Sequence, residues 1–83
     1  MGEKLKIIRE KIEPKMNEMN LIFVDIEYVL ENNYHFLRIT LDKVNGMDTD
    51  TIVKATNIIS PILDELDLID ESYILDVISK GSD

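Results

Sequence analysis

The stretch DTDT at residues 48–51 is the part of the sequence that most resembles a catalytic motif. Magnesium-dependent phosphotransferases use Asp-x-Asp followed by Thr, with the first carboxylate attacking phosphate and the metal held nearby. That chemistry requires the pair at the end of a buried apolar strand, whereas here it follows Asn45 and Gly46 and opens a predicted helix. Capping explains both acids, because Asp48 can accept from a free backbone N–H and Asp50 lies where the helix dipole favours negative charge. We expect no catalytic residues, and a small magnesium-dependent phosphohydrolase is the weakest alternative.

The residue types that usually bind metals or carry nucleophilic catalysis are scarce in this sequence. There is no cysteine and only one histidine, His35, which excludes thiolate ligands and any site built on several histidines of one chain. His35 lies between two aromatic residues on a predicted strand, where we expect it to be partly exposed. The glycines Gly2, Gly46 and Gly81 are not spaced for a phosphate-binding loop or for the GxxG clamp of KH domains. We expect no metal, no cofactor and no small-molecule substrate.

The acidic charge is concentrated in the second half of the chain. Residues 1–41 hold seven acids and six Lys or Arg, whereas residues 42–83 hold ten acids and three Lys, within a net charge of −8. Nucleic-acid binding draws on Lys and Arg, so the acidic half suits a basic protein surface better, or it serves solubility alone. No apolar run approaches 18 residues, and we expect a cytoplasmic protein that does not contact membranes.

Two helices are predicted in the sequence, and they would position the side chains discussed above. In residues 3–19 the apolar residues recur every three or four positions, at Leu5, Ile8, Ile12, Met16 and Met19. Pro14 interrupts this stripe, and we expect a kink or a break beside it. A second helix is predicted from about residue 49 to 66, kinked or restarted near Pro61.

Three strands are predicted in the remaining chain. Residues 21–30 are rich in β-branched and aromatic residues, and residues 34–42 follow after a turn at Asn32 and Asn33, which indicates a β-hairpin. Residues 73–78 alternate as a third strand. The order helix, strand, strand, helix, strand predicts one two-layer α+β domain over residues 1–83, with both helices on one face of a three-stranded sheet. This is also the frame of one KH type.

We place the strand at 21–30 in the centre of the sheet, because it is the longest and most apolar, with the third strand on its free side. Along this strand we expect Ile22, Val24 and Ile26 on one face and Phe23 and Asp25 on the other. The predicted core is Leu5, Ile8, Ile12, Met16, Val24, Ile26, Leu37, Ile39, Ile52, Ile59, Ile62, Leu75 and Val77.

The other face of the hairpin carries the aromatic residues Tyr34 and Phe36 beside Arg38. Such a set is typical of sheets on which RNA bases stack. Asp25 and Glu27 fall on the same face, however, and would repel phosphate, so packing against another protein or domain is the favoured interpretation.

Four segments together resemble the N-terminal domain of the bacterial ribosome maturation factor RimP family. They are IEPKMNEMNLIFVDIEYVLE, FLRITLDK, DTDTIVKATNIISPILDE after a glycine, and SYILDVISKG. The family shows an "L-V-D-V-E-Y" strand, a strand ending in Asp, a glycine-led helix ending in "L-L-D", and a terminal "Y-x-L-E-V-S-S-P-G". The segments cover nearly the whole chain in the family's order. Asn20 stands where a glycine is usual, and Ile78 and Lys80 replace Ser and Pro of the last motif.

The resemblance implies a non-catalytic assembly factor that binds the maturing small ribosomal subunit. Its partners would be a basic ribosomal protein and nearby ribosomal RNA, and a C-terminal Sm-like β-barrel would be a further domain of the factor, absent from this chain. For a contact made by this domain, the binding residues that we expect are Asp42, Lys43 and Gly46 on the loop, and Ser79 and Gly81 at the exit. A KH-like module that binds single-stranded RNA is the alternative.

Overall fold

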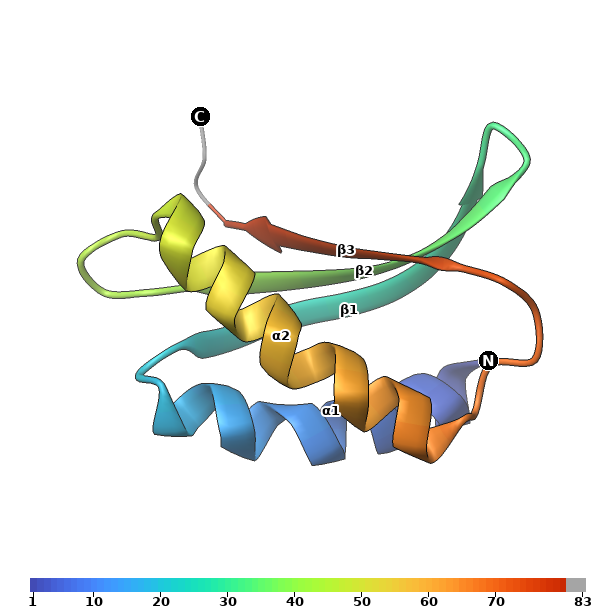
Figure 1. The fold of residues 1–83 in the computed structure, drawn as a ribbon, viewed down its shortest axis with the longest axis horizontal. Coiled ribbons are helices and arrows are strands. Elements are labelled where there is room, and N and C mark those ends of the chain that lie inside the picture. The colour runs from blue at the N-terminus through green and yellow to red at the C-terminus, as the bar shows by residue number, and fades with distance from the viewer. Residues whose placement is uncertain (81–83) are drawn as a thin grey trace.

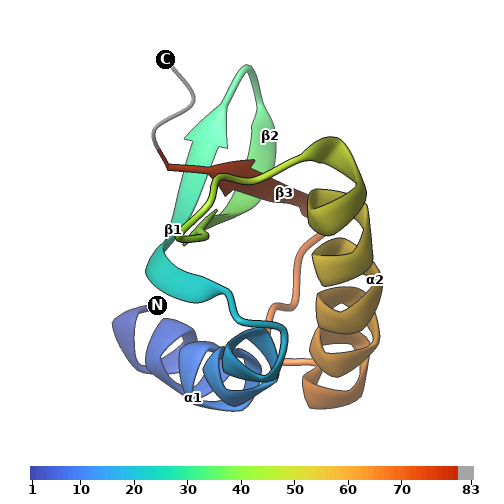
Figure 2. The same cartoon turned by 90° about the vertical axis from the view of Figure 1, so that its left-hand side faces the viewer.

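The computed structural model describes residues 1–80, in which two helices pack on one three-stranded sheet (Figure 1). The elements are α1 (Gly2–Glu18), β1 (Ile22–Glu31), β2 (Tyr34–Asp42), α2 (Thr49–Leu66) and β3 (Ile74–Ser79). Figure 2 shows the sheet as one layer and both helices on the same side of it. The two-layer α+β fold expected from the sequence is confirmed. No helix within residues 1–80 is both long and apolar enough to cross a bilayer.

The centre of the sheet is β2, and the prediction that residues 21–30 are central was wrong. β2 pairs with β1 in antiparallel fashion and with β3 in parallel fashion. The parallel pair follows from the connection through α2, because a helical crossover returns the chain beside the strand that it left. Apolar content misled the prediction, since part of the apolar content of β1 is not buried: Ile22 is 48 % exposed and Leu30 is 63 % exposed.

A β-bulge at Val24 explains why β1 departs from a simple alternation. Phe23 pairs with Leu41 and Asp25 with Thr40, so Val24 is the extra residue. Phe23 is buried before the bulge and Ile26 faces the core after it, although the expected alternation had placed them on opposite faces. The predicted packing of Val24 in the core is therefore wrong.

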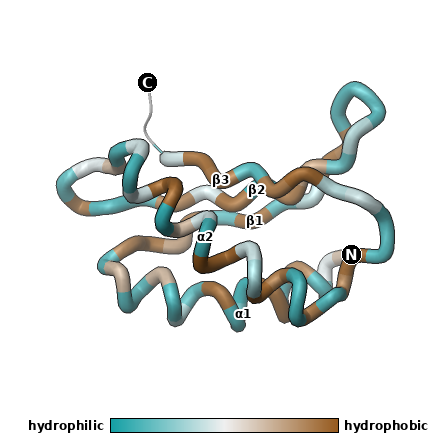
Figure 3. The backbone as a smooth tube through the Cα atoms, viewed as in Figure 1, coloured by the Kyte–Doolittle hydropathy of each residue, from teal (hydrophilic) through white to brown (hydrophobic). Residues whose placement is uncertain are grey.

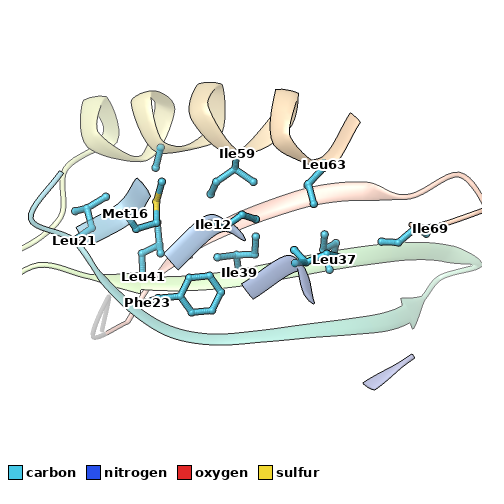
Figure 4. Packing of buried hydrophobic residues seen from close by; sticks show 12 residues of the cluster. Ile12, Met16, Leu21, Phe23, Leu37, Ile39, Leu41, Ile59, Leu63 and Ile69 are labelled. Carbon is cyan, nitrogen blue, oxygen red and sulfur yellow. The ribbon is translucent and has the colours of Figure 1, made fainter. Parts of the chain in front are cut away.

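The hydrophobic core lies between the helices and the sheet (Figure 4). The fully buried members that the sequence predicted are Ile8, Ile12, Met16, Leu37, Ile39 and Ile59. Further predicted members, Leu5, Ile26, Ile62, Leu75 and Val77, are partly buried against them. Ile52 lies outside this cluster. The prediction missed Leu21, Phe23, Leu41, Ala55, Leu63 and Ile69, which are also buried.

Both helices run without interruption through a proline. Hydrophobic and hydrophilic positions alternate along them in Figure 3, as an amphipathic helix requires. Pro14 and Pro61 are exposed, and so are Glu10 and Asn57, whose carbonyls each lose a backbone donor. Water can hydrate those carbonyls, so neither the break considered near Pro14 nor the restart considered near Pro61 occurs.

Asparagines make the tight turns of this fold. Asn32 and Asn33, with φ of 53° and 68°, form the two-residue loop of the hairpin, as the sequence predicted. Two consecutive positive φ values suit the right-handed twist of paired strands. Asn20 has φ of 63° between α1 and β1. The left-handed conformation there explains a glycine at this position in the family pattern, because asparagine tolerates it and glycine adopts it freely.

Candidate functional site

Four of the five predicted binding residues line one open hollow of about 750 Å³. Asp42 and Lys43 enter it from the end of β2, Gly46 from the connection to α2, and Ser79 from the end of β3. They meet because parallel strands end at the same edge of a sheet, where α/β proteins commonly bind ligands. The backbone N–H of Lys80 donates to the Leu41 carbonyl at 2.8 Å and continues this pairing beyond β3. Gly81 lies outside the described residues.

The connection that forms one wall of the hollow is ordered by its own backbone. The Gly46 N–H donates to the Lys43 carbonyl at 2.9 Å, and Gly46 has φ of 89°. At this φ a side chain would strain the backbone, although no atom lies within 4 Å of an added Cβ. The Lys43 N–H also donates to Asp42 Oδ1 at 2.8 Å, which fixes that carboxylate at the rim.

Apolar side chains in the hollow were missed by the sequence reasoning. Met47 and Ile52 are partly buried in its lining, and Val44 is 88 % exposed at its edge. The only signal in the sequence was Val44 itself, a single apolar residue within a polar connection, which could have indicated an apolar contact there. The charged lining contains both signs, with Asp42 and Lys43 adjacent. A surface of this composition suits contact with a folded protein better than capture of a small ion.

Asp48 lines the hollow, but its carboxylate caps the N-terminus of α2. Its Oδ1 accepts from the Thr51 N–H at 2.8 Å and from the Thr51 hydroxyl at 2.7 Å, and these hydrogen bonds lower the pKa of Asp48. The predicted capping role is confirmed. Among residues 1–80 no group of three or more His, Cys, Asp or Glu side chains is arranged to hold a metal ion. The phosphohydrolase alternative requires the same carboxylate that caps the helix.

Arg38 is the electrostatic centre of the sheet face that the helices leave uncovered. Its Nε lies 2.9 Å from Asp76 Oδ2, its Nη2 3.2 Å from Glu31 Oε1, and its Nη1 3.7 Å from Glu27 Oε1. Hydrogen bonds to Glu31 and Asp76 raise the pKa of Arg38. Its Cζ lies 5.7 Å from the centroid of the Phe36 ring. The expectation that Glu27 shares a face with Arg38 is confirmed by their pairing.

His35 belongs to an aromatic contact rather than to the hollow. Its ring stacks on Tyr28 with centroids 5.2 Å apart and planes within 4°. The Tyr28 hydroxyl donates to Glu71 Oε1 at 2.8 Å and so ties β1 to the connection between α2 and β3. Burial, followed by Glu71, raises the pKa of Tyr28 to about 12. As the sequence predicted, His35 is a partly exposed strand residue; its partner Glu71 is too distant in sequence to have been anticipated.

The fold and its surfaces define a small α+β domain with an open hollow at one sheet edge and an uncovered sheet face. The family model of the RimP N-terminal domain matches residues 11–83. The chain therefore belongs to the RimP N-terminal domain family, a family of ribosome maturation factors. The match covers both surfaces and all three strands, and it confirms the resemblance drawn from the four segments.

Proposed function

We propose that this domain is a non-catalytic binding module that acts on the maturing small ribosomal subunit in the cytoplasm. The observation that carries the proposal is the match to the RimP N-terminal domain over residues 11–83, because that family consists of ribosome maturation factors. Non-covalent binding is the activity that suits the chain, since the one motif typical of phosphotransfer is used to cap α2.

The charge of the domain favours a basic ribosomal protein as the first contact, with nearby ribosomal RNA reached through it. The net charge is −8, and ribosomal RNA carries a dense negative charge that such a surface repels. In the hollow, Asp42 and Lys43 would form polar contacts at the rim, while Gly46 and Ser79 leave room beside the exposed Val44. The residues proposed for this contact are Asp42, Lys43, Gly46, Ser79 and Gly81.

A second domain is part of the proposal. The resemblance implies a C-terminal Sm-like barrel in the complete factor, and the hollow lies at the end of β3, where Ser79 and Lys80 line it. Residues that a partner contacts in the hollow would then lie close to the point where the chain leaves this domain.

Co-sedimentation with immature small subunits tests the proposal. The chain should enter the subunit fraction at low salt and leave it as salt screens the attraction. Mature small subunits are the comparison, and they should retain less of the chain. Failure of the chain to associate with immature subunits at low salt would overturn the proposal. A steeply salt-dependent, micromolar affinity for single-stranded RNA alone would instead favour the KH-like alternative.

A further inference from the structure

The uncovered face of the sheet carries its side chains in rows that cross all three strands. Residues paired across neighbouring strands lie on the same face, so the pairing defines which side chains stand together. The rows are Val29–Phe36–Ile74, Glu27–Arg38–Asp76 and Asp25–Thr40–Ile78, with Tyr34 beside Glu31 at one end and Ile22 at the other. We call these residues the outer face. An apolar row therefore lies directly next to a charged one.

Large apolar side chains of the outer face are in contact with solvent. Tyr34 is 61 % exposed and Ile74 is 45 % exposed, while Ile22 and Ile78 are also exposed and Phe36 is half-buried. Both helices lie on the opposite side of the sheet (Figure 2). Soluble domains seldom leave such a set of apolar side chains together on one face unless something binds there.

The charge of the outer face decides what could cover it. Four carboxylates, those of Asp25, Glu27, Glu31 and Asp76, stand against the single guanidinium of Arg38, for a net charge of −3. A nucleic acid would be repelled, and so would the same face of a second copy. A polypeptide that brings lysine or arginine together with apolar side chains complements both the apolar and the charged row.

We propose that the outer face is the docking surface for an extended basic segment of a partner protein, in which apolar and basic side chains alternate on one side. Side chains on one side of an extended segment repeat about every 6.7 Å, which is also the spacing between successive rows of the sheet. An apolar residue over the Phe36 row thus brings a basic residue at i+2 over the Arg38 row. This inference deepens the proposed function and rests on it only for the origin of the segment, a basic protein of the small subunit.

Arg38 already pairs with the carboxylates that a lysine or arginine of the partner would contact. Its contacts with Glu27 and Glu31 are longer than its contact with Asp76, and both glutamates are half-exposed. A partner's lysine or arginine would take up these two carboxylates, while Asp76 keeps Arg38 at 2.9 Å. Removing the guanidinium frees all three acids, so Arg38→Met should strengthen the binding of a basic segment.

A titration of the chain with three synthetic peptides, followed by amide resonances in NMR spectra, tests the inference. The probe is three repeats of Leu-Ser-Lys-Ser; one comparison peptide has Ser for Leu and the other has Glu for Lys. The Leu-Lys probe should shift outer-face resonances, and each comparison peptide should bind about tenfold more weakly, as for the loss of a central interface contact. Shifts confined to the helices or the hollow, or equal binding of all three peptides, would overturn the inference.

Matched variants identify the surface. Tyr34→Ser and Ile74→Ser should each weaken the Leu-Lys probe about tenfold, whereas Val53→Ser, an exposed apolar change on α2, should not. Arg38→Met should tighten binding several-fold, and Lys54→Met, the same loss of charge on α2, should have less effect. Tyr34 is exposed enough that its change leaves the fold intact. An affinity unchanged by Tyr34→Ser, or equal effects of Arg38→Met and Lys54→Met, would refute the assignment.

The same variants separate this inference from the proposed function. If the wild-type chain and Tyr34→Ser associate equally with immature subunits, the docking surface is wrong and the function stands. If the wild-type chain binds the Leu-Lys probe through the outer face but never associates with subunits, the function is wrong and the surface stands. Tighter binding of a single-stranded oligouridylate than of the probe to this face would overturn the choice of a protein segment.

Discussion

Replacing Ile39 with alanine tests whether β2 is the strand on which this fold depends. The side chain is fully buried at the centre of the sheet, and the change removes three carbon groups. At about 0.8 kcal/mol for each buried group the transfer loss is about 2.4 kcal/mol. A cavity in a packed core adds roughly 1 kcal/mol, so the free energy of unfolding should fall by about 3.5 kcal/mol.

Ile22→Ala on β1 is the matched control for this prediction. The same atoms are removed, but Ile22 is about half exposed and leaves no enclosed cavity, so the loss should be about 1 kcal/mol. Urea denaturation followed by far-UV circular dichroism measures both values, with the slope against urea checked for constancy. A domain of this length has roughly 4–12 kcal/mol of stability, so Ile39→Ala leaves a marginal fold.

The refuting result is an equal loss for the two variants, or a larger loss for Ile22→Ala. Either would mean that Ile22 is packed in the core as tightly as Ile39, against the burial of the two side chains. A larger loss for Ile39→Ala by a factor of about three supports the placing of the core on the helix-covered face of β2.

Three further predictions concern the hollow and the aromatic contact. Gly46→Ala should lower the unfolding free energy by about 1 kcal/mol, because φ of 89° is strained for any side chain. Thermal unfolding measures this against Gly2→Ala at the start of α1, where alanine is unstrained and should not destabilise the fold. An absorbance titration should show one tyrosine that ionises near pH 12, and Tyr28→Phe should remove that step. Because folding raises the pKa of Tyr28, this residue stabilises the fold below about pH 10, and the contribution is lost as the pH rises towards 12. A midpoint near pH 10 would contradict the burial of Tyr28 together with its contact with Glu71. Val44→Ser should weaken association with immature subunits about fivefold without lowering stability, since the side chain contacts almost nothing in the free domain; unchanged association would remove Val44 from the binding surface.

Local structure followed from the sequence because its causes are local. The two-residue turn at Asn32 and Asn33 required only residues that tolerate positive φ between two alternating runs. The start of α2 required only an oxygen at Asp48 three residues before the N–H of Thr51. The resemblance to the RimP N-terminal domain likewise rested on motifs that are contiguous in the chain.

The strand order and the bulge could not be predicted from the sequence, because neither is determined by the residues of a single segment. The place of β3 depends on how α2 crosses the sheet, and apolar content along β1 carries no information on that crossing. Val24 is an ordinary strand residue with no glycine or proline beside it to indicate a bulge.

Part of the candidate site was accessible to sequence reasoning and part was not. Asp42 and Ser79 were chosen from separate motifs, and their meeting required the parallel pairing of β2 with β3. The ion pairs of Arg38 with Glu31 and Asp76 could be predicted only with the same pairing, since the two acids lie on the strands on either side of β2. Side chains on three strands form one network only when the central strand is known.

The crossover from β2 to β3 also sets the order in which the chain can fold. The hairpin of β1 and β2 closes through two residues, an event of about 1–10 μs, whereas the pairing of β3 with β2 must close the much longer segment 43–73, and we expect it to form later. Until then one side of β2 presents unpaired N–H and C=O groups, and the β3 of another molecule fits them as well as its own. At high protein concentration we expect refolding to produce dimers that have exchanged β3, while dilute refolding produces the monomer.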